Sequence, residues 1–328
     1  MKVARYIGGG EIAITEEATP SCPPGGLLIR TIASGLCSGE LMDWYMDRKI
    51  PHVLGHEVCG RIEHSEDTRF PVGAQVFVHH HAPCLECEVC QRGAYVHCEQ
   101  WRRTKLNPGG MAEFFAVSPD NLNDTLLVDD LRPMDAALIE PLACVVKSIR
   151  RADLRPDDRV AVIGLGVMGL MHALLARAQT PDVVSYDLND SRRRWAESVG
   201  VPTQAPEDAI PADVIFVCPG TAPALALAVQ IAAADARIIL FSPFRPGEEP
   251  VVSLNDLYFR DLQLITSYSC GPDDTRAAYE HLQNGDVKAE QVVSDFIEID
   301  ELPSAYQEMK RAEILKPMVI FGSPNATK

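Results

Sequence analysis

The sequence predicts a two-domain α/β protein, in which a β-rich domain is followed by a domain with a doubly wound parallel sheet. The length of 328 residues exceeds the roughly 100–200 residues that usually share one core. Short β-branched runs between Gly and Pro residues fill the first 140 residues, and short apolar strands alternate with helical stretches from about Arg159 onward. We therefore expect domains at 1–144 and 145–271 and a further segment at 272–328.

The first domain is expected to consist of short strands separated by turns. The run Leu27–Ile32 follows the turn-forming residues Pro23–Gly26 and predicts a strand, as does Val76–Val78. Val53 and Leu54 form a shorter, strand-like apolar approach to a Gly-His-Glu sequence. This texture is typical of a small β domain with many loops.

The second domain alternates strands and helices in the order that gives a parallel sheet. The expected strands are Arg159–Ile163, Val183–Asp187, Asp213–Cys218, Arg237–Ser242 and Leu262–Ser267. The expected helices are Val167–Gln179, Ser191–Val199 and Ala222–Ala234. The last segment is expected to contain a helix after Thr275, a turn at Asn284–Asp286, a strand-like run at Val292–Ile299, another helix and a closing strand at Pro317–Ile320.

Composition restricts the partners of the chain. A formal net charge of −16 argues against a nucleic acid, because phosphate backbones are bound by clustered Lys and Arg. No run reaches the roughly 18 apolar residues of a membrane-spanning helix, and the start lacks a basic-then-apolar signal pattern. We therefore expect a cytoplasmic protein without a membrane partner, whose 10 cysteines are reduced rather than paired in disulfides.

A glycine-rich loop lies near the start of the second domain. Gly164, Gly166 and Gly169 form Gly-x-Gly-x-x-Gly at the junction between a strand and a helix, with Val167 and Met168 inside the motif. Glycines there permit a tight turn, close approach of the backbone to a pyrophosphate, and tight packing of the helix on the strand. The helix N-terminus attracts the phosphates, so the motif predicts a dinucleotide site.

An acidic residue in register with this loop indicates which dinucleotide binds. Asp187 lies 187 − 169 = 18 residues after the last glycine, close to the ~20 expected of the acid that binds the ribose. Its carboxylate can accept hydrogen bonds from both ribose hydroxyls of NAD and would repel the 2′-phosphate of NADP. The sequence therefore predicts NAD. Arg192 either stacks near the adenine or belongs to a solvated helix face.

Four cysteines are concentrated in one loop, within about 80–100. Cys84, Cys87, Cys90 and Cys98 are separated by two, two and seven residues. Two intervening residues let the backbone curl so that both sulfurs reach one ion, and four thiolates suit the tetrahedral Zn²⁺ of structural sites. Because such a site leaves no open coordination position, we expect this zinc to stabilise the loop rather than to take part in catalysis.

A second metal site is suggested by residues from three separate stretches. His56 and Glu57 stand side by side in Gly-His-Glu-Val-Cys-Gly, and Cys37 offers a thiolate in a Gly- and Ser-rich stretch. Glu140 is an acid in an otherwise apolar segment, where an unpaired charge would be costly. A lone His in an apolar setting is more often a hydrogen-bonded core residue, so these residues alone are modest evidence.

The chain as a whole resembles the zinc-containing medium-chain dehydrogenases, most closely their polyol (sorbitol-type) and threonine dehydrogenase branch. The resemblance covers nearly the whole sequence. It is carried by Gly-His-Glu-x-x-Gly at 55–60, the cysteine lobe at 84–98, the segments 109–114 and 140–142, the glycine loop at 164–169 and the strand end at 187–189. It implies a GroES-like catalytic domain split around a Rossmann NAD-binding domain, with 272–328 completing the first domain.

The resemblance implies a role for each matching residue. Cys37 and His56 look like ligands of a catalytic zinc, and Glu57 looks like an acid that ligates it directly or through water. Glu140 matches the position where this branch uses a Glu ligand, and Glu40 stands where the family has an Asp that orients the zinc-bound His. The residues that match cofactor contacts are Met168, Asp187 and Arg192. Relatives are dimers or tetramers, so a homodimer or homotetramer is expected.

The sequence departs from the family at the proton relay. Gly39 and Met42 occupy the positions where the family has a Ser or Thr and a His. The candidate replacements are Ser38, Glu40 and the run His79–His81, in which His80 falls at a pocket-facing position. An imidazole that titrates near neutrality suits a proton shuttle, although surface histidines are common.

These features predict an enzyme that moves a hydride between a secondary alcohol and NAD, with one catalytic and one structural zinc per chain. The alcohol is expected to be a polyol, a sugar-derived alcohol or an amino alcohol. The alternatives are a reductase working in the reverse direction, a dehydrogenase of a phosphorylated substrate, and a non-catalytic protein that binds NAD and zinc. The side chains that could shape the substrate pocket are Trp44, Trp101, Arg102, Arg103 and Lys147.

Overall fold

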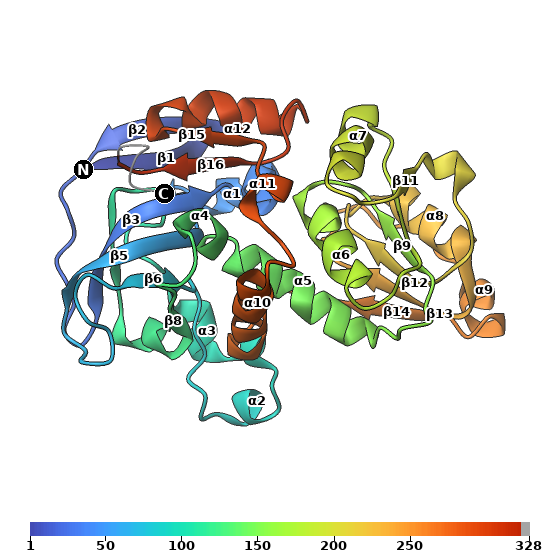
Figure 1. Cartoon of the computed structure of the whole chain (residues 1–328), viewed down its shortest axis with the longest axis horizontal. Coiled ribbons are helices and arrows are strands. Elements are labelled where there is room, and N and C mark those ends of the chain that lie inside the picture. The colour runs from blue at the N-terminus through green and yellow to red at the C-terminus, as the bar shows by residue number, and fades with distance from the viewer. Residues whose placement is uncertain (323–328) are drawn as a thin grey trace. The chain divides into compact units, whose positions relative to one another are not determined.

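The computed structural model describes residues 1–322, which form two compact units (Figure 1). One unit contains Met1–Ala143 and the segment that begins at Cys270, and the other is Cys144–Ser269. Helix α5 (Ile139–Ala152) carries the chain from the first unit into the second. Among residues 1–322, no helix is long and apolar enough to span a membrane.

The first unit is built on two sheets. Among residues 1–322, its three-stranded sheet has the order β2-β1-β4, and its seven-stranded sheet has the order β15-β16-β3-β5-β6-β8, with β7 also paired to β3. The strands are β1 (Lys2–Gly8), β2 (Glu11–Glu16), β3 (Leu27–Gly35), β4 (His52–Val53), β5 (Glu57–Ser65), β6 (Gln75–Val78), β7 (Phe114–Val117), β8 (Thr125–Leu127), β15 (Asp295–Ile297) and β16 (Pro317–Ile320). Because β16 pairs antiparallel with β3, the last segment of the chain completes the sheet that the first segment begins.

Short helices connect and cover these strands. The α-helices of the first unit are α1 (Asp43–Met46), α2 (Glu88–Gln91), α3 (Glu99–Arg103), α4 (Pro133–Ala136), the start of α5, α10 (Pro272–Asn284), α11 (Ala289–Val292) and α12 (Leu302–Lys310). The 3₁₀ helices are η1 (Ser38–Leu41), η2 (Asp47–Lys49), η3 (Tyr95–His97), η4 (Pro119–Asp124) and η6 (Ile299–Glu301). Helix α12 buries Leu302, Tyr306 and Met309, which share one face at helical spacing and pack on Ala4 and Tyr6 of β1.

The second unit contains one parallel sheet. Among residues 1–322 it has six strands in the order β11-β10-β9-β12-β13-β14, and Figure 1 shows helices α6 and α8 on opposite faces of it. The elements are β9 (Val160–Ile163), α6 (Val167–Arg177), β10 (Val183–Tyr186), α7 (Asp190–Ser198), β11 (Thr203–Gln204), η5 (Pro206–Asp208), β12 (Ala212–Val217), α8 (Ala222–Ile231), β13 (Ala232–Leu240), α9 (Leu254–Phe259) and β14 (Gln263–Thr266). Strand β9 is buried along its whole length, as expected of a strand covered on both faces. The predicted fold class, a β-rich domain with a doubly wound parallel-sheet domain, is confirmed.

Some predicted boundaries are wrong. Residues 232–234 were expected to continue a helix, but α8 ends at Ile231 and β13 begins at Ala232. Ala232 pairs with Ala212 of β12, so sheet pairing overrides the helix propensity of the alanine run. The expected strand over 292–299 is shortened to β15, and its first residue, Val292, ends α11 instead.

Candidate functional site

Strand pairing brings three of the expected metal ligands together in the first unit. Cys37 is the N-cap of η1, just after β3, and Glu57 is the first residue of β5, just after His56. Strands β3 and β5 are antiparallel neighbours with Gly35 opposite Glu57. One ligand atom each of Cys37, His56 and Glu57 therefore lies within 4.8 Å of the other two.

The loop that carries His56 is fixed by its contact with a glycine-rich segment. Gly55 has a φ of +89°, and its carbonyl accepts a hydrogen bond of 2.8 Å from the backbone N–H of Gly110. The carbonyl of Leu54 accepts a second hydrogen bond of 2.8 Å, from the N–H of Met111. A side chain at Gly55 would collide with this segment, so the close approach requires glycine.

A buried carboxylate orients His56. Oε1 of Glu40 lies 3.3 Å from Nδ1 of His56, and it also accepts a hydrogen bond of 2.9 Å from the backbone N–H of Gly55. Burial raises the pKa of Glu40, but the adjacent His56 and the Gly55 N–H outweigh it and lower this pKa. The carboxylate is therefore ionised and can hold the Nδ1–H of His56, which leaves Nε2 as the ligand atom.

This group has the chemistry of a catalytic zinc site. A thiolate, an imidazole and a carboxylate are three accepted ligands of Zn²⁺, and three protein ligands leave a fourth position for water or substrate. A carboxylate behind the imidazole is the usual partner of a metal-bound His. The donors at Cys37, His56 and Glu57, with Glu40 behind His56, fit a bound zinc ion.

One charged neighbour of this group was not anticipated. Lys316, which is buried, donates hydrogen bonds from Nζ to Oε2 of Glu57 and, over 2.9 Å, to the carbonyl oxygen of Leu36. The positive charge of Lys316 stabilises the buried Glu57 carboxylate, since a buried charge without a partner would destabilise the folded protein. In the sequence, Lys316 stands directly before the apolar strand residues 317–320, which could have marked it as a buried charge. Its partner Glu57 lies far away in the chain, so the pairing could not be predicted.

The three consecutive histidines occupy different environments. The His80 ring is 4.7 Å, centroid to centroid, from the His56 ring and 4.1 Å from the His81 ring. Nδ1 of His81 lies 2.8 Å from the carbonyl oxygen of Thr104, and the His81 ring is 4.2 Å from that of Trp101. His79 is fully buried and faces another cluster. Of the three, His80 lies beside the expected zinc ligand.

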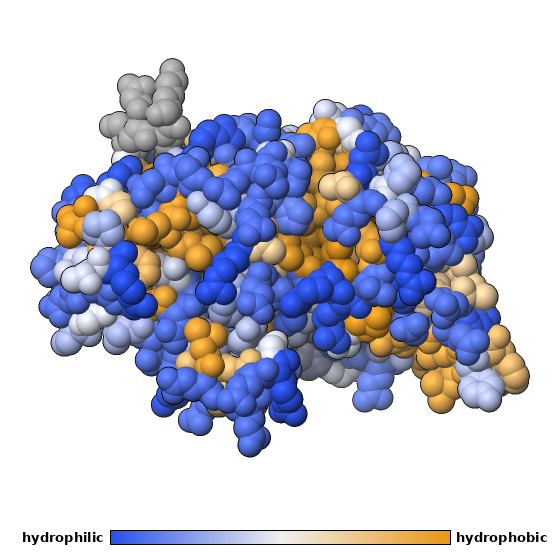
Figure 2. All heavy atoms as spheres, turned by 60° about the horizontal axis from the view of Figure 1, so that its bottom comes forward, coloured by the Kyte–Doolittle hydropathy of each residue, from blue (hydrophilic) through white to orange (hydrophobic). Residues whose placement is uncertain are grey.

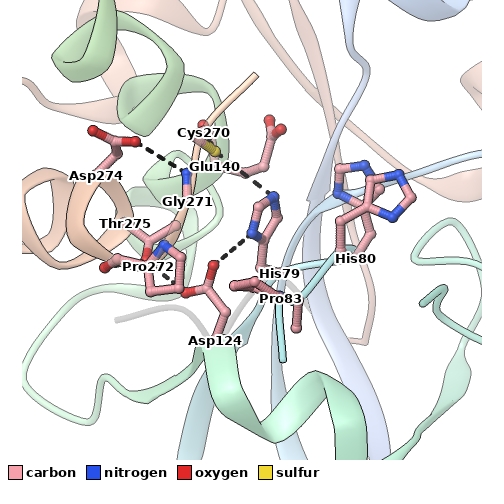
Figure 3. A network of polar contacts seen from close by, with 12 residues as sticks. His79, His80, Pro83, Asp124, Glu140, Cys270, Gly271, Pro272, Asp274 and Thr275 are labelled. Atoms are coloured by element: carbon pink, nitrogen blue, oxygen red, sulfur yellow. Dashed lines mark hydrogen bonds and ion pairs between the residues drawn. The ribbon is translucent and has the colours of Figure 1, made fainter. Parts of the chain in front are cut away.

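Glu140 lies outside the Cys37 group. It forms a second set of close donors with His79 and Cys270, all three of them buried (Figure 3). Burial raises the pKa of the Glu140 carboxyl, and the nearby His56 opposes this rise. Sequence reasoning missed Cys270, because an isolated cysteine near the start of a helix carries no spacing signal.

The four-cysteine lobe converges as its spacing predicts. Among its sulfur atoms, Cys84 and Cys90 are 3.9 Å apart, Cys87 and Cys90 are 3.5 Å apart, and Cys84 and Cys98 are 3.7 Å apart. The backbone N–H groups of residues 86 and 87 lower the pKa of Cys84 to about 6, which favours its thiolate. Four sulfurs in one closed group fit a tetrahedral structural zinc.

The glycine loop of the second unit has the geometry that a pyrophosphate needs. Gly164 directly follows β9 and has a φ of +89°, and Gly166 is the N-cap of α6. A side chain at Gly169 would collide with the carbonyl of Gly164, whereas one at Gly166 would enter open space. The first and third glycines thus close the turn, and the second leaves the helix N-terminus accessible to a phosphate.

The acidic partner of this loop is also in place. Oδ2 of Asp187 accepts a hydrogen bond of 2.6 Å from the N–H of Leu165, and Oδ1 accepts one of 2.8 Å from the N–H of Asn189. The Arg192 guanidinium lies 3.8 Å from the same carboxylate. Asp187 therefore links the glycine loop to the end of the next strand.

The residues expected to shape the pocket do not form one group. Trp101 is buried in the cysteine lobe, and the neighbouring Arg102 and Arg103 are exposed. The Trp44 ring packs edge-on against Tyr45. In the second unit, Lys147 donates a hydrogen bond of 2.7 Å to the carbonyl oxygen of Tyr268.

Comparison with known proteins agrees with this geometry. The alcohol dehydrogenase GroES-like domain matches residues 23–125. The chain is 25% identical to 2-dehydro-3-deoxy-L-galactonate 5-dehydrogenase of Pseudoalteromonas atlantica, over 94% of this chain and 95% of the relative. It is 28% identical to D-altritol 5-dehydrogenase of Agrobacterium fabrum, over 92% of this chain and 94% of the relative. 

A solved structure extends the similarity to the whole fold. A protein described as a zinc-binding dehydrogenase from Sinorhizobium meliloti 1021, bound to NADP, superposes with a TM-score of 0.87 and 25% identity, over 97% of this chain and 98% of that one. The GroES-like match, the full-length polyol dehydrogenase relatives and the shared two-domain fold agree with one another. Residues 23–125 thus match the alcohol dehydrogenase GroES-like domain, and over nearly its whole length the chain is similar to zinc-containing medium-chain dehydrogenases of the polyol dehydrogenase branch.

Proposed function

We propose that the chain transfers a hydride between a secondary alcohol and NAD, at a zinc ion held by Cys37, His56 and Glu57. The observation that carries this proposal is the convergence of these three donors beside the buried carboxylate of Glu40. The chain is an oxidoreductase acting on CH–OH groups, in keeping with its polyol dehydrogenase relatives. The same site could catalyse alcohol oxidation or the reverse carbonyl reduction. We propose that it works in the direction of alcohol oxidation.

Each metal has a defined set of proposed ligands. Cys37, His56 and Glu57 would hold the catalytic zinc. Glu140 stays a proposed ligand on the strength of the family resemblance alone, because its carboxylate lies in the other donor group, with His79 and Cys270. Glu40 orients His56. The ligands of the structural zinc are Cys84, Cys87, Cys90 and Cys98. We place the protein in the cytoplasm, where these thiols stay reduced.

The residues around the catalytic zinc have separate tasks. Cys37, His56 and Glu57 would hold a zinc ion that supplies Lewis acidity toward the alcohol oxygen. Lys316 balances the charge of Glu57. Burial and the neighbouring histidines hold the pKa of His80 well below its usual range, so its ring is neutral. Within residues 1–322, Nδ1 of His80 is buried without a hydrogen-bond partner, and a substrate hydroxyl would satisfy it.

The proposed cofactor is NAD rather than NADP. Asp187 directly follows β10 and contacts the glycine loop, and its carboxylate would bind the ribose hydroxyls and repel a 2′-phosphate. Arg192 already lies beside this carboxylate, which reduces its availability for a phosphate. The Sinorhizobium protein was solved with NADP. The proposed preference of this chain for NAD therefore rests on Asp187 and not on that similarity.

The proposed substrate is a polyol or a sugar-derived alcohol. The relatives from Pseudoalteromonas and Agrobacterium are named for oxidation of sugar-derived alcohols at carbon 5. An amino alcohol is the third substrate class that the sequence predicts. A panel of polyols, sugar acids, sugar phosphates and amino alcohols would separate these classes.

We also propose that the protein is a homodimer or homotetramer. Strand β14 ends the six-stranded sheet, and the preceding α9 exposes large apolar side chains, including Leu254, Tyr258 and Phe259, each more than three-quarters exposed. Figure 2 shows an apolar area at the lower right edge of the molecule, over α9. A second copy would cover this surface, because exposed patches of this kind mark contact sites. Light scattering of the purified protein measures the state directly.

The decisive test of the catalytic proposal combines turnover with cofactor binding. The wild type should reduce NAD with at least one alcohol of the panel, and Cys37→Ala and His56→Ala should each abolish turnover. Both variants should still bind NADH, measured by fluorescence titration, because the glycine loop and Asp187 belong to the other unit. Turnover that survives in either variant would refute the assigned zinc ligands.

A further inference from the structure

A second group of metal-ligating side chains lies in the first unit, apart from Cys37, His56 and Glu57. His79 follows β6, Glu140 is in the first turn of α5, and Cys270 lies two residues before α10. One ligand atom of each lies within 4.8 Å of the other two. All three side chains are buried, at 0%, 5% and 0% exposure in the order given, so three distant segments place chemically reactive groups in the interior.

His79 is held in the orientation and tautomer that a metal ligand requires. Its Nδ1 lies 2.7 Å from Oδ2 of Asp124, a buried carboxylate. Thr275 donates a hydrogen bond of 2.6 Å from Oγ1 to the other oxygen of Asp124, which fixes the carboxylate from the far side. With Nδ1–H donated to Asp124, Nε2 carries the free lone pair.

That lone pair faces the other two donors. Nε2 of His79 lies 3.7 Å from Sγ of Cys270, and Figure 3 shows His79 between Asp124 and Cys270 with Glu140 on the side of the thiol. A carboxylate, then an imidazole, then a metal is the order found around most metal-bound histidines. Glu40 and His56 make the same arrangement at the proposed catalytic zinc.

The backbone around each donor is fixed before any ion binds. The N–H of His79 donates to the carbonyl of Asp124 over 3.1 Å, and Nδ2 of Asn121 donates to the carbonyl of His79 over 3.0 Å. Next to Cys270, the N–H of Gly271 donates to Oδ2 of Asp274 over 3.0 Å, and a side chain at Gly271 would collide with the Tyr95 ring. Preorganised donors of this kind lower the cost of binding an ion.

We propose that His79, Glu140 and Cys270 bind a further zinc ion, in addition to the two ions of the proposed function. A thiolate, an imidazole and a carboxylate together select a borderline-soft ion such as Zn²⁺ or Co²⁺ over Mg²⁺ or Ca²⁺. Binding displaces the thiol proton of Cys270 to solvent and leaves two ligand anions facing the cation. Glu140 would supply the carboxylate ligand of this site.

The test is a zinc count on the whole protein, freed of metal with a chelator, reloaded with excess zinc and dialysed. The wild type should retain three zinc ions per chain by mass spectrometry of the metal. Cys270→Ala and His79→Gln should each retain two, and Cys59→Ser, which alters a buried thiol in β5 outside every donor group, should retain three. The proposal would be overturned if the wild type held only two zinc ions per chain. It would also be overturned if both Cys270→Ala and His79→Gln retained as many ions as the wild type.

A second measurement covers the case in which a ligand variant does not fold. Thr275→Val keeps all three ligands but removes the hydrogen bond to Asp124, and we expect it to weaken the additional ion by about 10–100-fold. Competition with a coloured zinc chelator measures this, and affinities equal to wild type at every site would count against the proposal. Turnover with the alcohol panel is a separate readout, so loss of the additional ion and failure of the dehydrogenase assignment remain distinguishable.

Discussion

Oε1 of Glu40 lies 3.3 Å from Nδ1 of His56, and the Glu40 side chain is almost completely buried. The two residues lie on either side of the segment 41–55, and the N–H of Gly55 binds the same carboxylate oxygen. The family usually has an Asp at this position, so the longer Glu40 reaches the imidazole with one more methylene. Because the pKa of the buried Glu40 carboxyl is lowered, Glu40 is ionised and can position His56, the proposed zinc ligand.

Replacing Glu40 should therefore loosen the catalytic zinc. In Glu40→Gln the side chain keeps its size but loses the charge that orients His56, and we expect zinc affinity at this site to fall about 10–100-fold. Turnover should fall with it and recover at high zinc, whereas NADH affinity should not change. Glu63→Gln, which alters an exposed carboxylate paired with Arg30, is the matched control. Unchanged zinc affinity in Glu40→Gln would show that His56 does not depend on Glu40.

The cysteine lobe should depend on its own zinc ion. Cys98→Ser removes one of four converging sulfurs, and we expect the protein to lose one zinc ion per chain. Residues of the lobe should then be cut first by a protease, because the ion replaces a hydrophobic core in this loop. Cys22→Ser, which changes a partly buried thiol outside the lobe, should keep the full count. A Cys98→Ser protein with all its zinc would disprove a four-sulfur site.

Asp187 should decide the choice between NAD and NADP. Asp187→Ala removes the proposed acceptor of the ribose hydroxyls, and hydrogen bonds to a charged group contribute roughly 1.5–3 kcal/mol. We expect NAD affinity to fall by one to two orders of magnitude, since each 1.4 kcal/mol is about tenfold, and NADP affinity to rise. Asp208→Asn, on the exposed surface of the same unit, should leave both unchanged. If Asp187→Ala binds NAD as well as wild type does, the carboxylate is not part of the site.

A buried ion pair should be essential for the stability of the second unit. The Arg237 guanidinium lies 2.6 Å from the carboxylate of Asp158 and donates a hydrogen bond of 2.6 Å to the carbonyl of Ala152. Arg237→Leu would leave the Asp158 charge buried without its cation, at a cost of about 3–5 kcal/mol. Denaturant unfolding measures this cost.

The exposed pair of Arg30 and Glu63 provides the comparison. Arg30→Leu should change the free energy of unfolding by only about 0–1 kcal/mol, because water screens exposed ion pairs. If the Arg237 and Arg30 variants lost similar stability, burial would not be the cause.

Local spacing was enough to predict the features that lie within one short segment. The glycine loop could be identified because Gly164, Gly166 and Gly169 serve one turn, and the four cysteines of the lobe because two intervening residues let neighbouring sulfurs reach one ion. The alternation of strands and helices also predicted the parallel sheet. Element boundaries were less certain, as at Ala232, where pairing with β12 outweighed the helix propensity of an alanine run.

Only the tertiary structure decided which distant side chains share a site. Glu140 resembled a ligand of the Cys37 group, yet the fold places its carboxylate in a set with His79 and Cys270, and it places Lys316 against Glu57. The pairing of β3 with β5 and β16 aligns residues 35, 57 and 318, although up to 283 positions (318 − 35) separate them in the chain. Sequence spacing constrains contacts along a turn or a loop, whereas contacts between such segments depend on how whole strands and helices pack, which no local pattern records.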